Sequence, residues 1–221
     1  MINLECIYKL DDKSNEDISE LSLEINQGDF ISISGDKQSS VITLINIIGL
    51  LENPSRGNYY FNNQLISDKP LKYITKTRVE NFGFIFKEPL LIDYLSIYDN
   101  MVLILKSAGK RTICQKDFIY NIASKFKINY LLNKFPNKLS FKEQQIVMLS
   151  RAMLLEPEVL IVYDPTNEMD SSDKDEFMKL LVQLNNDGLT IIFGCYNYIP
   201  VQIPKSYYIS KGIIKQNLCE I

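Results

Sequence analysis

A short apolar strand that ends in glycine and leads into an apolar helix constrains this chain more than any other feature. Residues Phe30–Ser34 have the pattern of a buried strand, and Gly35 ends it. Residues 41–48 then carry apolar side chains at helical spacing and on most of the remaining surface, so we expect this helix to be central. The order of strand, glycine-led loop and apolar helix is the setting in which many proteins hold phosphate groups.

Strands and helices continue to alternate along the rest of the chain. Strands are expected at residues 21–25, 59–61, 159–163 and 190–194, and helices near 98–106, 116–126, 140–155 and 174–185. A glycine-containing segment at 186–188 ends the last of these helices. This alternation predicts an α/β fold with a mostly parallel sheet.

Composition restricts the class of protein and its location. The 221 residues are 46% hydrophobic and 23% charged, which is typical of a soluble globular chain. The longest apolar-rich run, residues 41–51, is too short to cross a bilayer. The first residues have neither the basic start nor the apolar core of a signal peptide. We therefore expect a cytosolic protein.

Histidine, cysteine and net charge exclude several kinds of chemistry. The sequence contains no histidine, so histidine-based acid–base catalysis and histidine metal sites are excluded. Its four cysteines form no Cys-x-x-Cys pair and are expected to be reduced packing residues. A net charge of −3 lacks the basic surplus of a nucleic-acid-binding protein.

Five segments carry a resemblance to a known family. They are Gly35–Thr43, Phe82–Lys87, Leu139–Gln145, Leu160–Ser171 and Thr190–Asn197. In these segments the chain resembles the nucleotide-binding subunits of ABC transporters, most nearly the lipoprotein-release, macrolide-export and bacteriocin-export branch. In that family the corresponding segments are, in order, the phosphate-binding loop, the Q-loop, the signature, the Walker B strand with the D-loop, and the switch strand. They occur in the family's order and together span essentially the whole chain.

The resemblance implies an architecture and partners. It implies a P-loop NTPase fold of the ABC type, with a mostly parallel sheet, an N-terminal antiparallel β part and an inserted helical lobe. The single domain, residues 1–221, would divide into a core lobe of Met1–Phe86 and Leu139–Ile221 and a helical lobe of 87–138. Such subunits lie on the inner face of the cell membrane against a permease, and they form homodimers or heterodimers with another ABC ATP-binding subunit.

The family's functional residues map onto specific positions of this chain. Asp164 stands at the catalytic glutamate position, Tyr196 at the switch histidine and Lys87 at the Q-loop glutamine. The remaining candidates are Gly35, Lys37, Ser39, Ser40 and Thr43 in the phosphate loop, Ser140 in the signature and Asp170 in the D-loop. No metal-ligand set is predicted.

Several positions depart from what phosphate chemistry requires. Val41 and Ile42 stand where the family has the lysine that neutralises phosphate and the hydroxyl that holds Mg²⁺. Tyr163 replaces the Walker B aspartate, while Phe141 and Lys142 replace the signature glycines. Together these losses remove charge neutralisation, metal binding and water positioning, each of which contributes to transition-state stabilisation. They predict a pseudo-ATPase in which binding of ATP and Mg²⁺ is weak or absent.

Individual residues allow more than one interpretation. Lys37 and Lys87 are either solvated surface lysines or residual anion-binding groups. Asp164 is either a surviving general base or a carboxylate at a strand end. Tyr163 is expected to fill space left by nucleotide and metal, as is Tyr196. Phe141 either anchors a contact with a dimer mate or membrane subunit, or covers the start of its own helix.

Three hypotheses about function follow. The first is a non-catalytic ABC subunit that docks on a permease and acts structurally or in regulation. The second is a working ATPase of an exporter in which Lys37 and Lys87 replace the missing lysine. The third is a soluble binding module that has left transport. ATP binding, and association with a permease, distinguish them.

Overall fold

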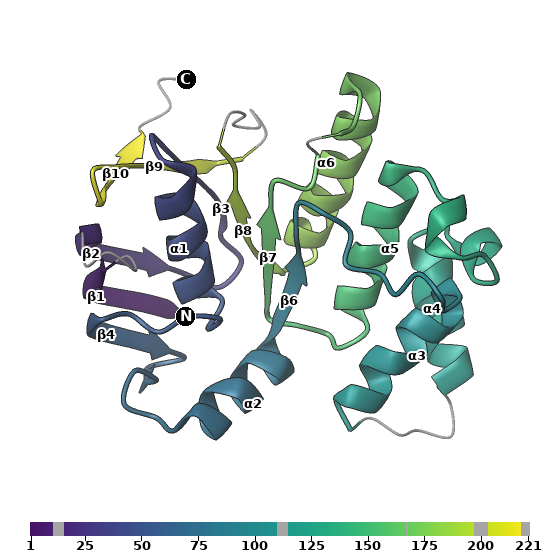
Figure 1. Cartoon of the computed structure of the whole chain (residues 1–221), viewed down its shortest axis with the longest axis horizontal. Helices are drawn as coiled ribbons and strands as arrows, with labels where there is room; N and C mark the ends of the chain where they lie inside the picture. The colour runs from purple at the N-terminus through teal and green to yellow at the C-terminus, as the bar shows by residue number, and fades with distance from the viewer. Residues whose placement is uncertain (11–15, 110–114, 167, 197–202, 218–221) are drawn as a thin grey trace.

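The chain folds into two β-sheets with helices packed between and beside them (Figure 1). This computed structural model describes residues 1–10, 16–109, 115–166, 168–196 and 203–217. In chain order the elements are β1 Ile2–Leu10, β2 Glu16–Ile25, β3 Phe30–Gly35, α1 Gln38–Ile48, β4 Arg56–Phe61, β5 Gln64–Leu65, α2 Leu71–Asn81, β6 Phe82–Ile85, α3 Ile97–Ser107, α4 Gln115–Lys125, η1 Asn129–Leu131, η2 Pro136–Lys138, α5 Phe141–Met153, β7 Val159–Tyr163, α6 Ser171–Asn186, β8 Thr190–Gly194, β9 Lys205–Ser210 and β10 Ile213–Asn217.

The smaller sheet is antiparallel and has the strand order β2-β1-β4-β5. Along the second half of β2, Leu21, Leu23 and Ile25 are buried, while Ser22 and Glu24 between them are exposed. This two-residue alternation is the pattern of a strand with one face against a core. The expected N-terminal antiparallel part of the fold is confirmed.

The larger sheet has the order β10-β9-β3-β8-β7-β6. Its pairs are parallel except for the terminal β9–β10 hairpin. Along β7, Val159, Ile161 and Tyr163 belong to one apolar cluster, and Leu160 and Val162 belong to another. Both faces of this sheet are therefore covered, as expected for parallel strands with helices on either side.

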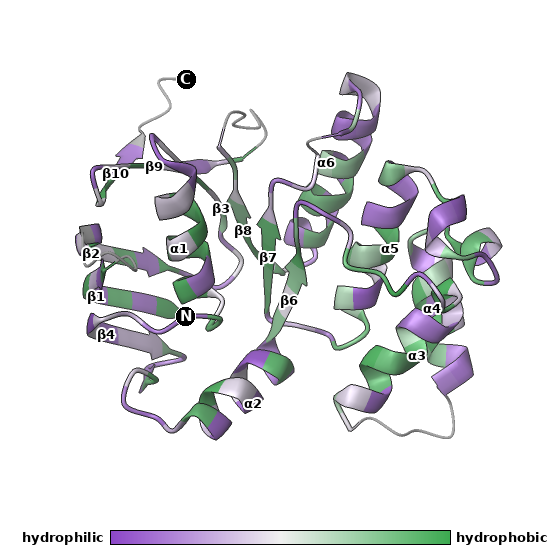
Figure 2. Ribbon diagram, in the orientation of Figure 1, coloured by the Kyte–Doolittle hydropathy of each residue, from purple (hydrophilic) through white to green (hydrophobic). Residues whose placement is uncertain are grey.

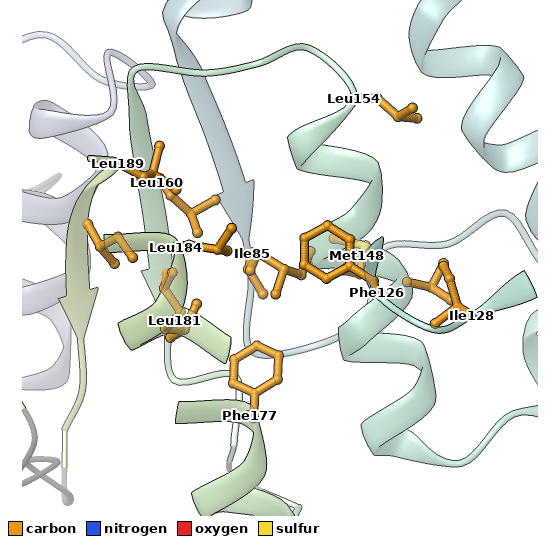
Figure 3. Packing of buried hydrophobic residues seen from close by; sticks show 14 of the residues in the cluster. Ile85, Phe126, Ile128, Met148, Leu154, Leu160, Phe177, Leu181, Leu184 and Leu189 are labelled. Carbon is orange, nitrogen blue, oxygen red and sulfur yellow. The ribbon is translucent and has the colours of Figure 1, made fainter. Parts of the chain in front are cut away.

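Helix α1 packs on one face of the larger sheet and also contacts β2 of the smaller one. Helices α5 and α6 cover the opposite face, and α3 and α4 pack beyond α5 (Figure 1). The apolar stripes of these helices turn toward the sheet and toward one another (Figure 2). Figure 3 shows part of the larger apolar cluster, the one that contains Leu160 and Val162 of β7. In it, Ile85 and Leu160 of the sheet lie near Leu181 and Leu184 of α6.

Parallel strands β3, β7 and β8 all end at the same edge of the larger sheet. Their last residues are Gly35, Tyr163 and Gly194. Helix α1 begins at this edge directly after β3. Ligands of open α/β sheets bind outside the carboxyl ends of the strands, so this edge is where a site is expected.

The structure adds elements that periodicity did not predict. Only Ile74 and Thr77 of helix α2 are buried, so its sequence has no clear apolar stripe from which a helix could be predicted. Strands β6, β9 and β10 were also not predicted, and α6 begins at Ser171, three residues before its expected start at Lys174. The proposed division into core and helical lobes remains a prediction. No helix in the described ranges combines the length and apolar character needed to cross a membrane.

Candidate functional site

The loop between β3 and α1 is tight at its first residue. A Cβ atom on Gly35 would lie 2.4 Å from Ile209 Cγ2 and 2.7 Å from the Ile209 carbonyl oxygen, so only glycine fits. The next residue, Asp36, donates its backbone N–H to that same carbonyl at 3.1 Å. Helix α1 then begins after Lys37, whose exposed side chain makes no capping hydrogen bond.

Two hydroxyl groups near the start of α1 are bound by a carboxylate from the smaller sheet. Ser40 Oγ donates to Asp17 Oδ1 at 2.6 Å, and Thr43 Oγ1 donates to Asp17 Oδ2 at 2.6 Å. Asp17 lies on β2 and is half-buried. This carboxylate therefore ties strand β2 to the first two turns of α1 through two side-chain hydroxyls. Asp17 was not identified from the sequence, because no sequence pattern connects it with Ser40 and Thr43, which lie 23 and 26 positions further along the chain.

A second carboxylate lies within the loop itself. Asp36 Oδ2 accepts hydrogen bonds from Ser210 Oγ at 2.8 Å and from the backbone N–H of Lys211 at 3.3 Å. These bonds, above all the one from Ser210, lower the pKa of Asp36, which therefore stays ionised. Ser39 is exposed on the first turn of α1.

The side chains that follow in α1 face the core. Val41 is fully buried in the cluster beneath the loop, and Ile42 is half-buried against it. These side chains contribute apolar contacts to folding. They offer neither a charge nor an oxygen atom to a ligand.

Tyr163 closes the end of β7. It is only 8% exposed, and its hydroxyl accepts a hydrogen bond from Gln38 Nε2 at 3.0 Å. Burial raises the pKa of the Tyr163 phenol, so it remains neutral. Tyr196 differs from Tyr163, because it is 38% exposed and lies two residues beyond the end of β8 at Gly194. Its interpretation as a residue that fills a vacated site stays a prediction.

Asp164 and Lys87 form a long ion pair at the same edge, with 4.0 Å between Asp164 Oδ2 and Lys87 Nζ. Asp164 has a left-handed backbone (φ +43°), and its N–H donates to the Gly194 carbonyl at 2.8 Å. Burial raises the pKa of Asp164, while Lys87 and Lys174 partly oppose that shift. Lys87 therefore lies beside a carboxylate, while its side chain is still 38% exposed, and both interpretations of this residue stay open.

Gln145 on α5 holds the backbone next to Lys87. It is fully buried, and its Nε2 donates to the carbonyl oxygens of Phe86 at 3.2 Å and Lys87 at 2.9 Å. The Gln145 Oε1 atom is buried and has no hydrogen-bond partner among the described residues. The side chain thus fixes the position of Lys87 through the backbone.

The signature segment is engaged in helix capping. Ser140 Oγ accepts from the Glu143 N–H at 3.2 Å, and the Ser140 N–H donates to Glu143 Oε2 at 2.8 Å, which completes a capping box. Phe141 is half-buried against the larger apolar cluster, which agrees with its interpretation as a cover for the start of its helix. Asp170 caps α6 by accepting from the Asp173 N–H at 2.8 Å.

Lys142 connects the two capped helices. Its Nζ lies 2.7 Å from Asp173 Oδ1 and also pairs with Glu176, both on α6. These bonds raise the pKa of Lys142 and lower that of Glu176.

The site candidates form two groups. The phosphate-loop residues lie at the end of β3, at the sheet edge that also holds Lys87, Asp164 and Tyr163, while Ser140 and Asp170 cap neighbouring helices.

The described residues include no group of three or more His, Cys, Asp or Glu side chains arranged to hold a metal ion. Of the four cysteines, Cys6 is exposed and Cys195 is buried. Cys114 and Cys219 lie outside the described residues.

The chain was compared with known protein families and structures. The sequence model of the family described as "ABC transporter" matches residues 18–167. A macrolide export ATP-binding/permease protein MacB from a Shewanella species is 34% identical over 175 residues, which is 79% of this chain but 27% of that protein. The lipoprotein-releasing system ATP-binding protein LolD of Buchnera aphidicola is 30% identical over 187 residues, covering 84% of this chain and 82% of that protein.

Solved structures give the same result. The dimeric structure of MJ0796, described as a bacterial ABC transporter cassette, superposes with a TM-score of 0.86 at 26% identity, covering 98% of each chain. A second structure of that protein is a dimeric post-hydrolysis state bound to ADP and phosphate, with the same score. This chain spans less than a third of the length of the MacB proteins it matches.

Proposed function

Because the chain belongs to the ABC transporter family of ATP-binding domains, we propose that it is a catalytically degenerate member, a pseudo-ATPase. In this role it docks on a membrane permease and acts structurally or in regulation of export. The relative MacB is named as a macrolide export ATP-binding/permease protein, and the relative LolD is named as the ATP-binding protein of a lipoprotein-releasing system. The proposed partners follow from that relationship.

The observation that carries the proposal is the Asp17 carboxylate on helix α1. Two hydroxyls of the segment that resembles the phosphate-binding loop, Ser40 and Thr43, already donate to it. A phosphate bound beside them would have to compete with these two bonds and lie close to the negative charge of Asp17. The lysine that offsets such repulsion in the family is Val41 here, and Val41 is buried. The residues present therefore do not fit a nucleotide phosphate or its Mg²⁺.

The other catalytic positions support the same conclusion. Tyr163 brings a neutral phenol to the position of the Walker B aspartate, and Tyr196 is exposed at the switch position. Asp164 retains a carboxylate, but Lys87 faces it in the place of the Q-loop glutamine. A general base needs a positioned substrate and metal to be useful. Because phosphate binding and metal binding are both weakened here, the Asp164 carboxylate alone is not expected to support ATP hydrolysis.

The signature favours a structural or regulatory role over partial activity. Sites in this family combine the phosphate loop of one subunit with the signature of its dimer mate. Here Phe141 is half-buried against the core, and Lys142 is held by Asp173 and Glu176 of α6. A heterodimer with an active subunit would therefore have impaired composite sites on both sides.

An ATP hydrolysis assay on the purified chain, with an intact cassette such as MJ0796 as the positive control, tests the proposal. We expect no hydrolysis above background, and no change in the Lys37→Ala and Lys87→Ala variants. The competing proposal is an exporter ATPase with relocated lysines. It is supported by the closeness of Lys87 and Asp164 at the sheet edge. Family-level hydrolysis that either variant abolishes would establish this alternative and contradict ours.

Docking is tested separately from hydrolysis. The tagged chain is co-expressed with a permease encoded beside it, and the membranes are extracted with detergent. We expect the permease to co-purify at a stoichiometry that persists after washing with salt. If the chain remains entirely separate from such permeases, the alternative of a non-transport binding module gains support.

A further inference from the structure

A groove lies between the end of α4, the start of α5 and the middle of α6. Helices α5 and α6 lie on the opposite side of the larger sheet from α1 (Figure 1). Its volume is about 490 Å³, within the range of small-molecule sites. Four lysines, two glutamates, a tyrosine, a glutamine and several apolar side chains line it. They are Lys125, Phe126, Lys127, Ile128, Tyr130, Leu131, Lys142, Glu143, Ile146, Glu176, Lys179, Leu180 and Gln183.

The floor of the groove is apolar. Phe126, Ile128 and Leu131 belong to the main hydrophobic cluster and are at most 6% exposed (Figure 3 shows the first two). Ile146 of α5 and Leu180 of α6 are half-buried and pack against the same cluster from the two walls. A ligand that covers these walls would remove apolar surface from water.

The rim of the groove carries four lysines and two glutamates, so cations are in excess. Glu143 keeps its charge, and its oxygens accept hydrogen bonds from the Ser140 N–H and from Tyr130 Oη at 3.0 Å, while Glu176 pairs with Lys142. Among the described residues, Lys127 and Lys179 form no ion pair, and both are exposed. Two lysines are thus available to an anion beside an apolar floor.

Part of this rim is specific to the chain. Lys142 stands at a signature position where the family resemblance has a glycine, and a glycine could not reach Glu176. The bridge from Lys142 neutralises Glu176 beside Lys179, which is also close enough to lower the pKa of Glu176. Without Lys142, the acidic wall of α6 would repel an anion.

We propose that this groove binds a small amphipathic carboxylate. The apolar part of the ligand lies against Ile146 and Leu180, and its carboxylate lies between the ammonium groups of Lys127 and Lys179. An inorganic anion would leave the apolar walls in water, and a neutral apolar molecule would leave the two lysines without a partner. The combination of one apolar surface and one pair of cations selects a ligand with both properties.

Calorimetric titration of the whole chain with octanoate tests the site. Octan-1-ol and acetate serve as probes that carry only the apolar part or only the charge. We expect saturable binding of octanoate with one site, and affinities at least tenfold weaker for the other two probes. Absence of saturable octanoate binding up to 10 mM would overturn the proposal, as would equal affinity for octan-1-ol.

Matched variants locate the binding. The double variant Lys127→Gln/Lys179→Gln is expected to weaken octanoate binding about tenfold or more. Leu180→Gln is expected to weaken binding by removing the apolar contact. The control variant Lys72→Gln/Lys106→Gln removes two exposed lysines of α2 and α3, outside the groove, and should bind within twofold of the unmodified chain. Undiminished binding by folded groove variants, checked by their melting curves, would place the octanoate elsewhere and overturn the assignment.

Discussion

The carboxylate of Asp17 on strand β2 accepts a 2.6 Å hydrogen bond from the hydroxyl of Ser40 on helix α1. Ser40 is buried, and Thr43 donates to the other oxygen of the same carboxylate. The smaller sheet and the central helix are thus joined by a charged group at the place where the family binds phosphate. This relationship links the stability of the fold to the proposed loss of nucleotide binding.

Removing the Asp17 carboxylate should destabilise the protein. In Asp17→Ala both hydroxyls lose their acceptor and the buried Ser40 group is left unsatisfied, a loss of about 1–3 kcal/mol in the free energy of unfolding. Denaturant unfolding measures it. Asp17→Asn keeps one acceptor oxygen and should lose less. If Asp17→Ala unfolded at the same denaturant concentration as the unmodified chain, the two bonds would contribute nothing to stability.

The sequence predicted the alternating strands and helices because their apolar periodicity is strong, as in β3, α1, β7 and β8. It did not predict α2, whose two buried residues form no stripe. It also could not predict the bond between Asp17 and Ser40, since a contact between a strand and a helix depends on sheet packing. The resemblance identified the altered positions, but the bridge from Lys142 to α6 appears only when the helices are placed side by side.

Asp164 should make stability depend on pH. Burial raises its pKa in the folded chain, so at pH values between the pKa of the unfolded carboxyl and its raised pKa in the folded chain the folded state binds more protons than the unfolded state. Its contribution to stability therefore becomes unfavourable as the pH rises through the range between those two pKa values, and it stays unfavourable at higher pH. Asp164→Asn removes the charge and suits the left-handed backbone, so we expect a higher melting temperature at pH 7.

The gain from Asp164→Asn should disappear as the pH falls and the carboxyl of the unmodified chain becomes protonated. Melting curves of both proteins between pH 3 and pH 7 measure this. Asp170→Asn, which changes an exposed capping carboxylate, is the matched control. A gain that stays constant down to the lowest pH would show that removal of the charge is not its cause.

Lys142 should contribute a modest, salt-dependent stabilisation between α5 and α6. Its partners Asp173 and Glu176 are partly exposed, so replacement by methionine should cost about 1 kcal/mol or less. The cost should shrink in 1 M salt, because the Debye length falls to about 3 Å. Urea unfolding at low and high salt measures it, with Lys72→Met at an exposed position of α2 as the control. A cost that does not change with salt would indicate lost packing instead of lost ion pairing.

The most direct test of the central claim is calorimetric titration of the purified chain with ATP and Mg²⁺ up to millimolar concentration. With Asp17 bound to the loop hydroxyls and Val41 buried, we expect no saturable heat. Saturable binding at micromolar ATP would contradict this account, and it would identify Lys37 and Lys87 as the first residues to replace.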